Sequence, residues 1–178
     1  MATDLPALTA ALTAGRDLAP AEAASAAAAM ADAEVADEAK EAFLLALARK
    51  GETAAEVTGF AKTYRALARR ADFGDWPAKG IDIVGTGGDQ SNSFNVSTVT
   101  ALVVAGAGVP VCKHGNRAAS SKCGAADVLE ELGVAIELDP IGVAQCIDEA
   151  GMGFCLAARF HPAFRYTGPS RRAIGIST

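Results

Sequence analysis

The chain of 178 residues is long enough for one ordinary domain, or for a small domain with part of a larger one. Its net charge of −5 gives no basic footprint for nucleic acid, and no stretch approaches the ~20 apolar residues that span a bilayer. We therefore expect partners other than nucleic acid or a membrane. The four cysteines are Cys112, Cys123, Cys146 and Cys155, and none of them has CxxC spacing. This favours reduced thiols and a cytoplasmic location over disulfides or a zinc site.

The first 72 residues are predicted to form helices only. Apolar residues recur at helical spacing from Leu5 to Leu12. Further on, Thr53 is followed three residues later by Glu56, which is the pattern of a capping box at a helix start. We expect residues 1–72 to form a helical subdomain.

Residues 73–80 are predicted to be a linker and hinge, because they contain two glycines and Pro77. Trp76 within it is expected to pack between domains. From Ile81 the pattern changes to alternating strands and helices, which indicates parallel β–α units over residues 81–163. We predict strands at 81–84, 109–112, 134–138 and 153–156, and helices near 97–107, 125–132 and 140–150.

A glycine-rich loop follows the first of these strands. Gly85-Thr86-Gly87-Gly88-Asp89 leaves backbone N–H groups uncovered, and such a loop can wrap a phosphate. The helix expected after it begins close to Asn95, Ser97 and Thr98, and a helix N-terminus adds partial positive charge. This turn by itself is weak evidence, because glycine is common in tight connections.

A second polar loop, Lys113 to Gly124, follows the next strand. Its twelve residues include two lysines, an arginine and a histidine but no acid, although the chain as a whole is acidic. The alternative interpretation is a solvated basic loop. Two such loops at strand ends favour a polyanionic small molecule bound at the carboxyl edge of an α/β sheet.

The motifs GTGGD, FNVST and KHGNRAASSKCGAADVLE together resemble the anthranilate phosphoribosyltransferase family, which has the nucleoside-phosphorylase-like fold. The resemblance extends upstream to Ala42 and downstream through His161-Pro162 to Arg172, and it covers only the first half of the family. It implies an N-terminal helical subdomain followed by a partial parallel α/β domain. It also implies that residues 164–178 pack back on the helices.

The function implied by the resemblance belongs to tryptophan biosynthesis. The phosphoribosyl group of 5-phosphoribosyl diphosphate is transferred to the amine of anthranilate, and diphosphate is released. Magnesium (Mg²⁺) is the implied cofactor, and a homodimer through the helical subdomain is the implied assembly. Catalysis of this reaction rests on positioning and on stabilising the leaving group, so no catalytic side chain is assigned.

The resemblance also implies roles for individual residues. Ser97 matches a metal ligand, and the anthranilate site is implied at Gly85, His114, Asn116 and Arg171. Arg171 would pair with the anthranilate carboxylate, with a helix-surface charge as the alternative; for His114 the alternative is a structural hydrogen bond. The phosphoribosyl diphosphate site is implied at Gly85, Gly88, Asp89, Ser93, Asn95, Val96, Ser97, Thr98, Lys113, His114, Gly115, Asn116, Arg117, Ala118, Ala119, Ser120, Ser121 and Ala125.

Three positions depart from the family pattern. Ala125 and Cys123 stand where serine is common, and Tyr166 replaces a frequent histidine. A lost hydroxyl that bonded a ligand costs about 0.5–1.5 kcal/mol, so we expect weaker binding rather than a different function.

Other functions remain open at this point. They are a pyrimidine nucleoside phosphorylase, a nucleic-acid-binding relative, and a half-length chain that binds ligand without turnover.

The adjacent acids Glu130-Glu131 and Asp148-Glu149 are interpreted as solvated helix faces away from the two loops. We therefore expect the chain alone to lack a complete magnesium site.

Overall fold

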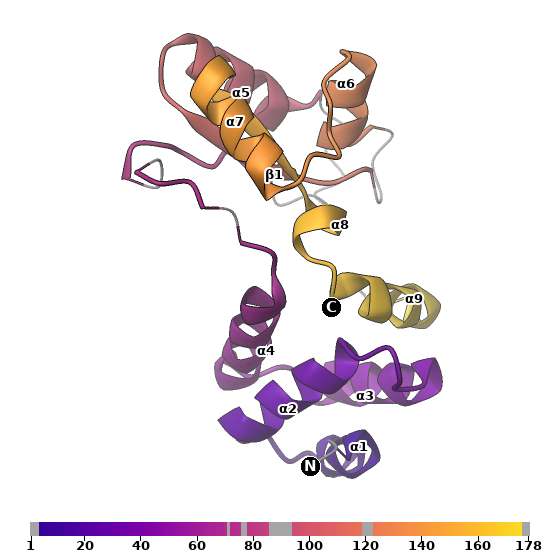
Figure 1. The fold of residues 1–178 in the computed structure, drawn as a ribbon. Coiled ribbons are helices and arrows are strands. Elements are labelled where there is room, and N and C mark those ends of the chain that lie inside the picture. Colours follow the sequence, from indigo (N-terminus) through magenta and orange to yellow (C-terminus); the bar gives the residue numbers. More distant parts are fainter. Residues whose placement is uncertain (1–3, 71, 76–77, 86–93, 119–122, 176–178) are drawn as a thin grey trace. The chain divides into compact units, whose positions relative to one another are not determined.

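The structure is a computed structural model that describes residues 4–70, 72–75, 78–85, 94–118 and 123–175 (Figure 1). Its contacts divide the chain into two compact units. Unit 1 comprises residues 1–68 and 161–178, and unit 2 comprises residues 69–160. Among the described helices, none combines the length and the apolar character needed to cross a bilayer.

Unit 1 is a bundle of helices. Its helices are α1 (Leu5–Thr13), α2 (Pro20–Met30), α3 (Asp37–Lys50), α4 (Ala54–Leu67) and α9 (Phe164–Ile174). Helix α1 packs on α3, α2 packs on α4, and α9 returns to pack on α3. The alanines of α2 allow close packing: a Cβ added to Gly59 of α4 would lie 2.8 Å from the Cβ of Ala23.

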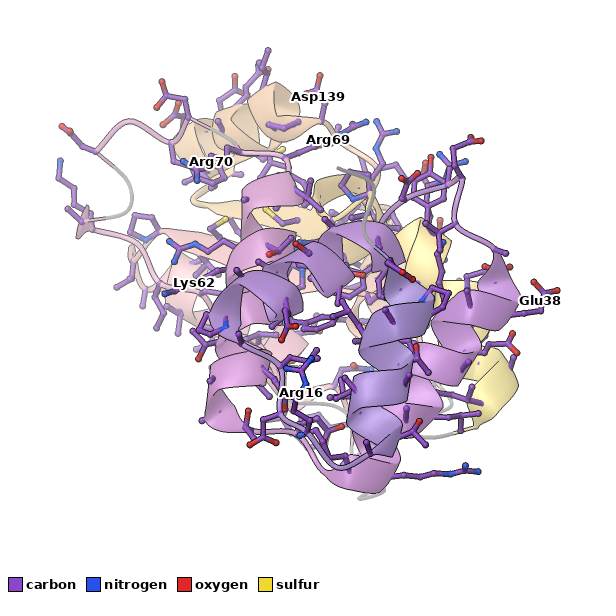
Figure 2. The ribbon with its side chains drawn as sticks, turned by 90° about the horizontal axis from the view of Figure 1, so that it is seen from below. Arg16, Glu38, Lys62, Arg69, Arg70 and Asp139 are labelled. Carbon is purple, nitrogen blue, oxygen red and sulfur yellow. The ribbon has the colours of Figure 1, made fainter. Side chains whose placement is uncertain are left out.

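Two buried charged side chains join the helices of unit 1. Lys40 is 1% exposed, and its Nζ donates to the carbonyls of Asp32, 2.6 Å away, and Tyr166, 3.1 Å away. Glu56 is equally buried and belongs to the capping box predicted at Thr53. The charged side chains of Glu38 and Lys62, in contrast, lie exposed on the outer surface of the bundle (Figure 2).

Unit 2 is a parallel α/β structure. It contains α5 (Val96–Gly106), β1 (Val111–Gly115), α6 (Ala125–Glu131), α7 (Pro140–Ala150), β2 (Met152–Leu156) and α8 (Ala157–Phe160) (Figure 1). Strands β1 and β2 pair in parallel, with Val111 opposite Met152. Helix α7 covers one face of the pair through Val143 and Ile147, and α6 packs on the other face against Phe154 and Leu156. The predicted fold class, helices followed by parallel α/β units, is confirmed.

The strand predicted at 81–84 is wrong beyond its first residue. Ile81 forms a parallel bridge with Val111, but the ladder stops there. The amide of His114 donates to the Asp82 carboxylate, 3.1 Å away, and the carbonyl of Ile83 accepts from the Lys113 side chain. Side chains therefore take the hydrogen bonds that a strand pairing would have made.

The strand predicted at 134–138 is also wrong. These residues have no strand conformation, and the amide of Val134 instead closes the end of α6 on the carbonyl of Leu129. Ile136 still buries its side chain beside Phe154. The alternating apolar pattern thus indicated that one face is buried. A strand and an extended connection can both bury one face, so the pattern does not distinguish them.

Candidate phosphate-binding site

Lys113 is the centre of the candidate site. It lies on β1, is 1% exposed, and donates from Nζ to the carbonyl of Ile83 at 2.7 Å and to Oγ of Ser97 at 3.2 Å. Burial lowers the pKa of Lys113, and the nearby Asp82 carboxylate opposes that shift. One cation therefore joins the segment after Ile81, the first turn of α5 and the end of β1.

The second loop is tied to the same place. Asn95 is the residue before α5, and its Nδ2 donates to the carbonyl of Cys123 at 3.2 Å. Gly124 then lets the backbone of residues 116–118 approach α6, because a Cβ at Gly124 would clash with the amide nitrogen of Ala118. Gly85, the described residue of the first loop, and Cys123 of the second thus both lie near the start of α5.

Thr98 adds an unusual polar group at this point. It is 1% exposed, and its hydroxyl is buried with no hydrogen-bond partner among the described residues. Buried hydroxyl groups are normally bonded, so this orphan marks a position where a ligand oxygen would be favourable.

Arg117 is held by acids of α6. Its guanidinium pairs with Glu130 at 2.7 and 3.0 Å and with Asp127 at 3.4 Å, and these contacts raise the pKa of Arg117. The expectation that Glu130 lies away from the loops was therefore wrong. Glu130 lies on an exposed helix face, and its partner Arg117 precedes it by thirteen residues. Helical spacing indicates only pairs three or four residues apart, so it could not indicate this one.

Sequence reasoning also missed Asp127 and Asp82 as organisers of the loops. The Asp127 carboxylate accepts from the amide of Ala118 at 3.0 Å and from that of Gly124 at 2.7 Å. These bonds lower the pKa of Asp127, the one from Ala118 most. A carboxylate three residues after Gly124 is a recognisable helix-start signal, so this role could have been found.

The structure brings some of the predicted residues together, and others lie outside the residues that it describes. Those near the described ends of the loops are Gly85, Asn95, Val96, Ser97, Thr98, Lys113, Gly115, Asn116, Arg117, Ala118 and Ala125. His114 follows Lys113 on β1, so strand alternation places its side chain on the opposite face. Gly88, Asp89, Ser93, Ala119, Ser120 and Ser121 lie outside the described residues, as does Trp76.

Arg171 belongs to unit 1, on α9. It lines a pocket of about 290 Å³ with Tyr64, Phe164 and Thr167. The Tyr64 hydroxyl donates to Thr167, whose own hydroxyl donates to the carbonyl of Met30 at 2.9 Å, and burial raises the pKa of Tyr64. The pocket thus combines apolar walls with one guanidinium and with the carboxyl groups of Glu52 and Glu56.

The described residues do not by themselves fit a magnesium ion. Among them no three carboxylate, histidine or cysteine side chains converge. Ser97 offers one oxygen, but that oxygen already faces the ammonium group of Lys113. Mg²⁺ prefers an octahedral shell of oxygens, so further ligands would have to come from elsewhere.

The chain is an α/β protein with a helical bundle and a parallel α/β unit. Its buried lysine lies at the carboxyl ends of the strands, where proteins of this class bind ligands. Two family models match the chain: "Glycosyl transferase family, a/b domain" over residues 78–178, and "Glycosyl transferase family, helical bundle domain" over residues 6–68. The chain therefore belongs to this glycosyl transferase family.

Similar proteins carry a more specific name. The anthranilate phosphoribosyltransferase of Chloroflexus aurantiacus is 54% identical over 169 residues, which is 95% of this chain and 49% of that protein. The one from Salinispora arenicola is 50% identical over 137 residues, or 76% of this chain and 39% of that protein. The chain thus spans about half the length of the curated relatives it matches.

Solved structures agree with this similarity. The anthranilate phosphoribosyltransferase of Thermus thermophilus has a TM-score of 0.83 and 41% identity, covering 96% of this chain and 51% of that one. The enzyme of Saccharomyces cerevisiae in complex with PRPP and Mg has a TM-score of 0.84 and 27% identity, covering 98% of this chain and 52% of that one. The resemblance stated from the motifs is confirmed, including its restriction to one half.

Proposed function

We propose that this chain is the part of an anthranilate phosphoribosyltransferase that holds 5-phosphoribosyl diphosphate. The enzyme would transfer the phosphoribosyl group to the amine of anthranilate in tryptophan biosynthesis. The observation that carries the proposal is the buried Lys113 ammonium, placed between the Ile83 carbonyl and the Ser97 hydroxyl. A buried cation is costly unless it is compensated, and a polyanionic ligand supplies that compensation.

The chemistry asks the protein to hold a highly charged leaving group. As the bond between C1 of the ribose and the diphosphate oxygen breaks, negative charge grows on diphosphate. Lys113 and the donors at the start of α5 would stabilise that charge, and the unpartnered hydroxyl of Thr98 would meet a ligand oxygen. The amides of the loop that begins at Gly85 would complete the cradle.

The remaining roles extend the proposal to the whole enzyme. Arg171 would pair with the anthranilate carboxylate, and residues 73–80 would act as a hinge. Magnesium would be bound with Ser97 as one ligand, and oxygens outside the described residues would supply the rest. A cytoplasmic homodimer through the helical unit completes it. Because the chain spans about half of its relatives, we expect binding without appreciable turnover from these residues alone.

Binding of diphosphate tests the site directly. In calorimetric titrations of the chain with diphosphate, Lys113→Met should weaken the affinity roughly 10–100-fold, since one charge-assisted contact is lost. Methionine fills the same buried space, so the fold is expected to persist. Lys62→Met, which removes an exposed lysine from unit 1, is the matched control. Equal affinities of the Lys113 and Lys62 variants would refute the assignment.

Turnover is tested with a chimera. The chain joined to the remaining half of the Chloroflexus aurantiacus relative should form fluorescent phosphoribosyl-anthranilate from anthranilate and 5-phosphoribosyl diphosphate, and a chelator should abolish it. Robust, chelator-insensitive product formation by the 178 residues alone would contradict the expected division of the site. A chimera that binds diphosphate but makes no product would favour a ligand-binding half without turnover.

A further inference from the structure

Two thiols meet on the face of the sheet opposite Lys113. The Sγ atoms of Cys112 on β1 and Cys155 on β2 lie 3.6 Å apart. Cys112 is paired with Gly153, and side chains alternate along a strand, so Cys112 and Cys155 share the face that α7 covers. The candidate phosphate site uses neither thiol.

The strand register disfavours a disulfide between them. Cys155 stands two residues beyond Gly153, the partner of Cys112. With strands about 4.8 Å apart and a rise of about 3.3 Å per residue, the two Cα atoms are separated by about 8 Å. A disulfide needs Cα atoms within about 7 Å, so the pair remains two thiols unless the backbone moves.

A single bridging atom fits the same spacing better. A metal ion about 2.3 Å from each sulfur, with a tetrahedral angle between them, separates the sulfurs by about 3.8 Å. We propose that Cys112 and Cys155 form a two-thiolate site for one soft, thiophilic metal ion. Two thiolates neutralise a divalent ion, so the site can lie against apolar neighbours such as Val143 and Ile147.

The chemistry of the pair favours stepwise loading. The hydrogen bond between the thiols lowers the pKa of Cys112 and raises that of Cys155. Cys112 therefore ionises first, and the arriving ion displaces the proton of Cys155. In total two S–H bonds break, two metal–sulfur bonds form, and two protons pass to solvent.

A pocket gives the ion access. Cys112 lines a cavity of about 260 Å³ together with Phe73, Ile81, Asp82 and Pro110. Asp82 contributes negative charge there, which attracts a cation. No third ligand side chain converges with the thiols in the part of the chain that the structure describes, so water would fill the remaining positions. Two thiolates with water select soft ions over Mg²⁺ or Ca²⁺.

Cadmium is a suitable probe. In a background with Cys123→Ser and Cys146→Ser, the chain should bind one Cd²⁺ with thiolate-to-metal charge-transfer absorption and release two protons. Below the thiol pKa values, its affinity should rise about 100-fold per pH unit, because two protons are displaced. This readout is independent of diphosphate binding and of turnover. Failure of the metal site can therefore be distinguished from failure of the proposed function.

Single substitutions decide whether both sulfurs take part. Cys112→Ser and Cys155→Ala should each weaken binding by roughly 100-fold or more and reduce the pH dependence to about 10-fold per unit. Circular dichroism checks that each variant is folded, and Cys112, which is only partly buried, is the substitution better tolerated. Unchanged affinity in either folded variant, or release of a single proton by the background protein, would overturn the proposal.

Discussion

Replacing Glu56 by glutamine should remove one of the main stabilising contacts of unit 1. Oε1 accepts from the amide of Leu18 at 2.8 Å, and Oε2 accepts from the amide of Thr53 at 2.8 Å and from Lys50 at 3.0 Å. Burial would raise the pKa of Glu56, but these bonds outweigh it and hold the value at about 2, below the ordinary 4.5. A glutamine can keep only one accepting oxygen, so its NH₂ group would face donors.

The pKa shift sets the size of the effect. A depressed carboxyl pKa stabilises the fold above its unfolded value, and that stability is lost as pH falls from about 4.5 to about 2. At about 1.4 kcal/mol per unit the shift corresponds to at most about 3.5 kcal/mol, and screening by solvent near the surface reduces it. At neutral pH we therefore expect Tm to fall by up to about 6–12 °C in Glu56→Gln.

Urea and thermal unfolding, followed by circular dichroism from pH 7 to pH 2, measure both effects. The wild-type chain and Glu56→Gln should differ at neutral pH and converge near pH 2, since protonation removes the same contacts. Glu52→Gln is the matched control, because Glu52 is exposed in the same connection. If the difference between wild type and Glu56→Gln stays constant across this range, the carboxylate does not stabilise the fold through its charge.

Two further substitutions test unit 2. Gly153→Ala should destabilise the chain by about 1–3 kcal/mol in urea unfolding, because a Cβ there would lie 2.7 Å from Val143 and 2.9 Å from Ile147; an unchanged midpoint would contradict this packing of α7. Asp127→Asn should speed hydrogen exchange at the amides of Ala118 and Gly124, because both donate hydrogen bonds to the Asp127 carboxylate in the wild-type chain. Acidification of the wild-type chain should lower the protection of these two amides relative to their intrinsic exchange rates at each pH, because the lowered pKa of Asp127 means that this ordering is lost as pH falls; unaltered protection would exclude the capping role.

Elements with local start and stop signals could be predicted from the sequence. Helix α7 runs from Pro140 to Ala150 as predicted, because Asp139 caps its start and Gly151 ends it at φ +75°. Strand β2 was predicted at 153–156 and begins directly after that glycine, at Met152. In each case the residues that fix the boundary are within a few positions of it, so a sequence window contains them.

The strand at 81–84 could not be excluded from the sequence, because its fate depends on partners thirty residues away. Ile81 makes the two ladder hydrogen bonds expected of a parallel strand, with Pro110 and Cys112. One residue later, the amide of His114 donates to the Asp82 carboxylate instead of to a backbone carbonyl of this segment. An apolar run predicts burial, and only the three-dimensional neighbourhood decides whether backbone or side chain satisfies the opposing amide.

The candidate site was predictable to the same degree. The composition of the loops indicated a polyanionic ligand and the family resemblance implied Lys113 in its site, but neither indicated that the ammonium group is buried against a backbone carbonyl. Strand alternation makes the rest follow: if Lys113 faces the loops, Cys112 must face α7, where it meets Cys155. Asp82 belongs to both sides, since it opposes the lowered pKa of Lys113 and also lines the pocket of Cys112. Its replacement by asparagine would therefore act on the anion site and on the thiol pocket together, whereas substitutions at Lys113 or Cys112 act on one face each.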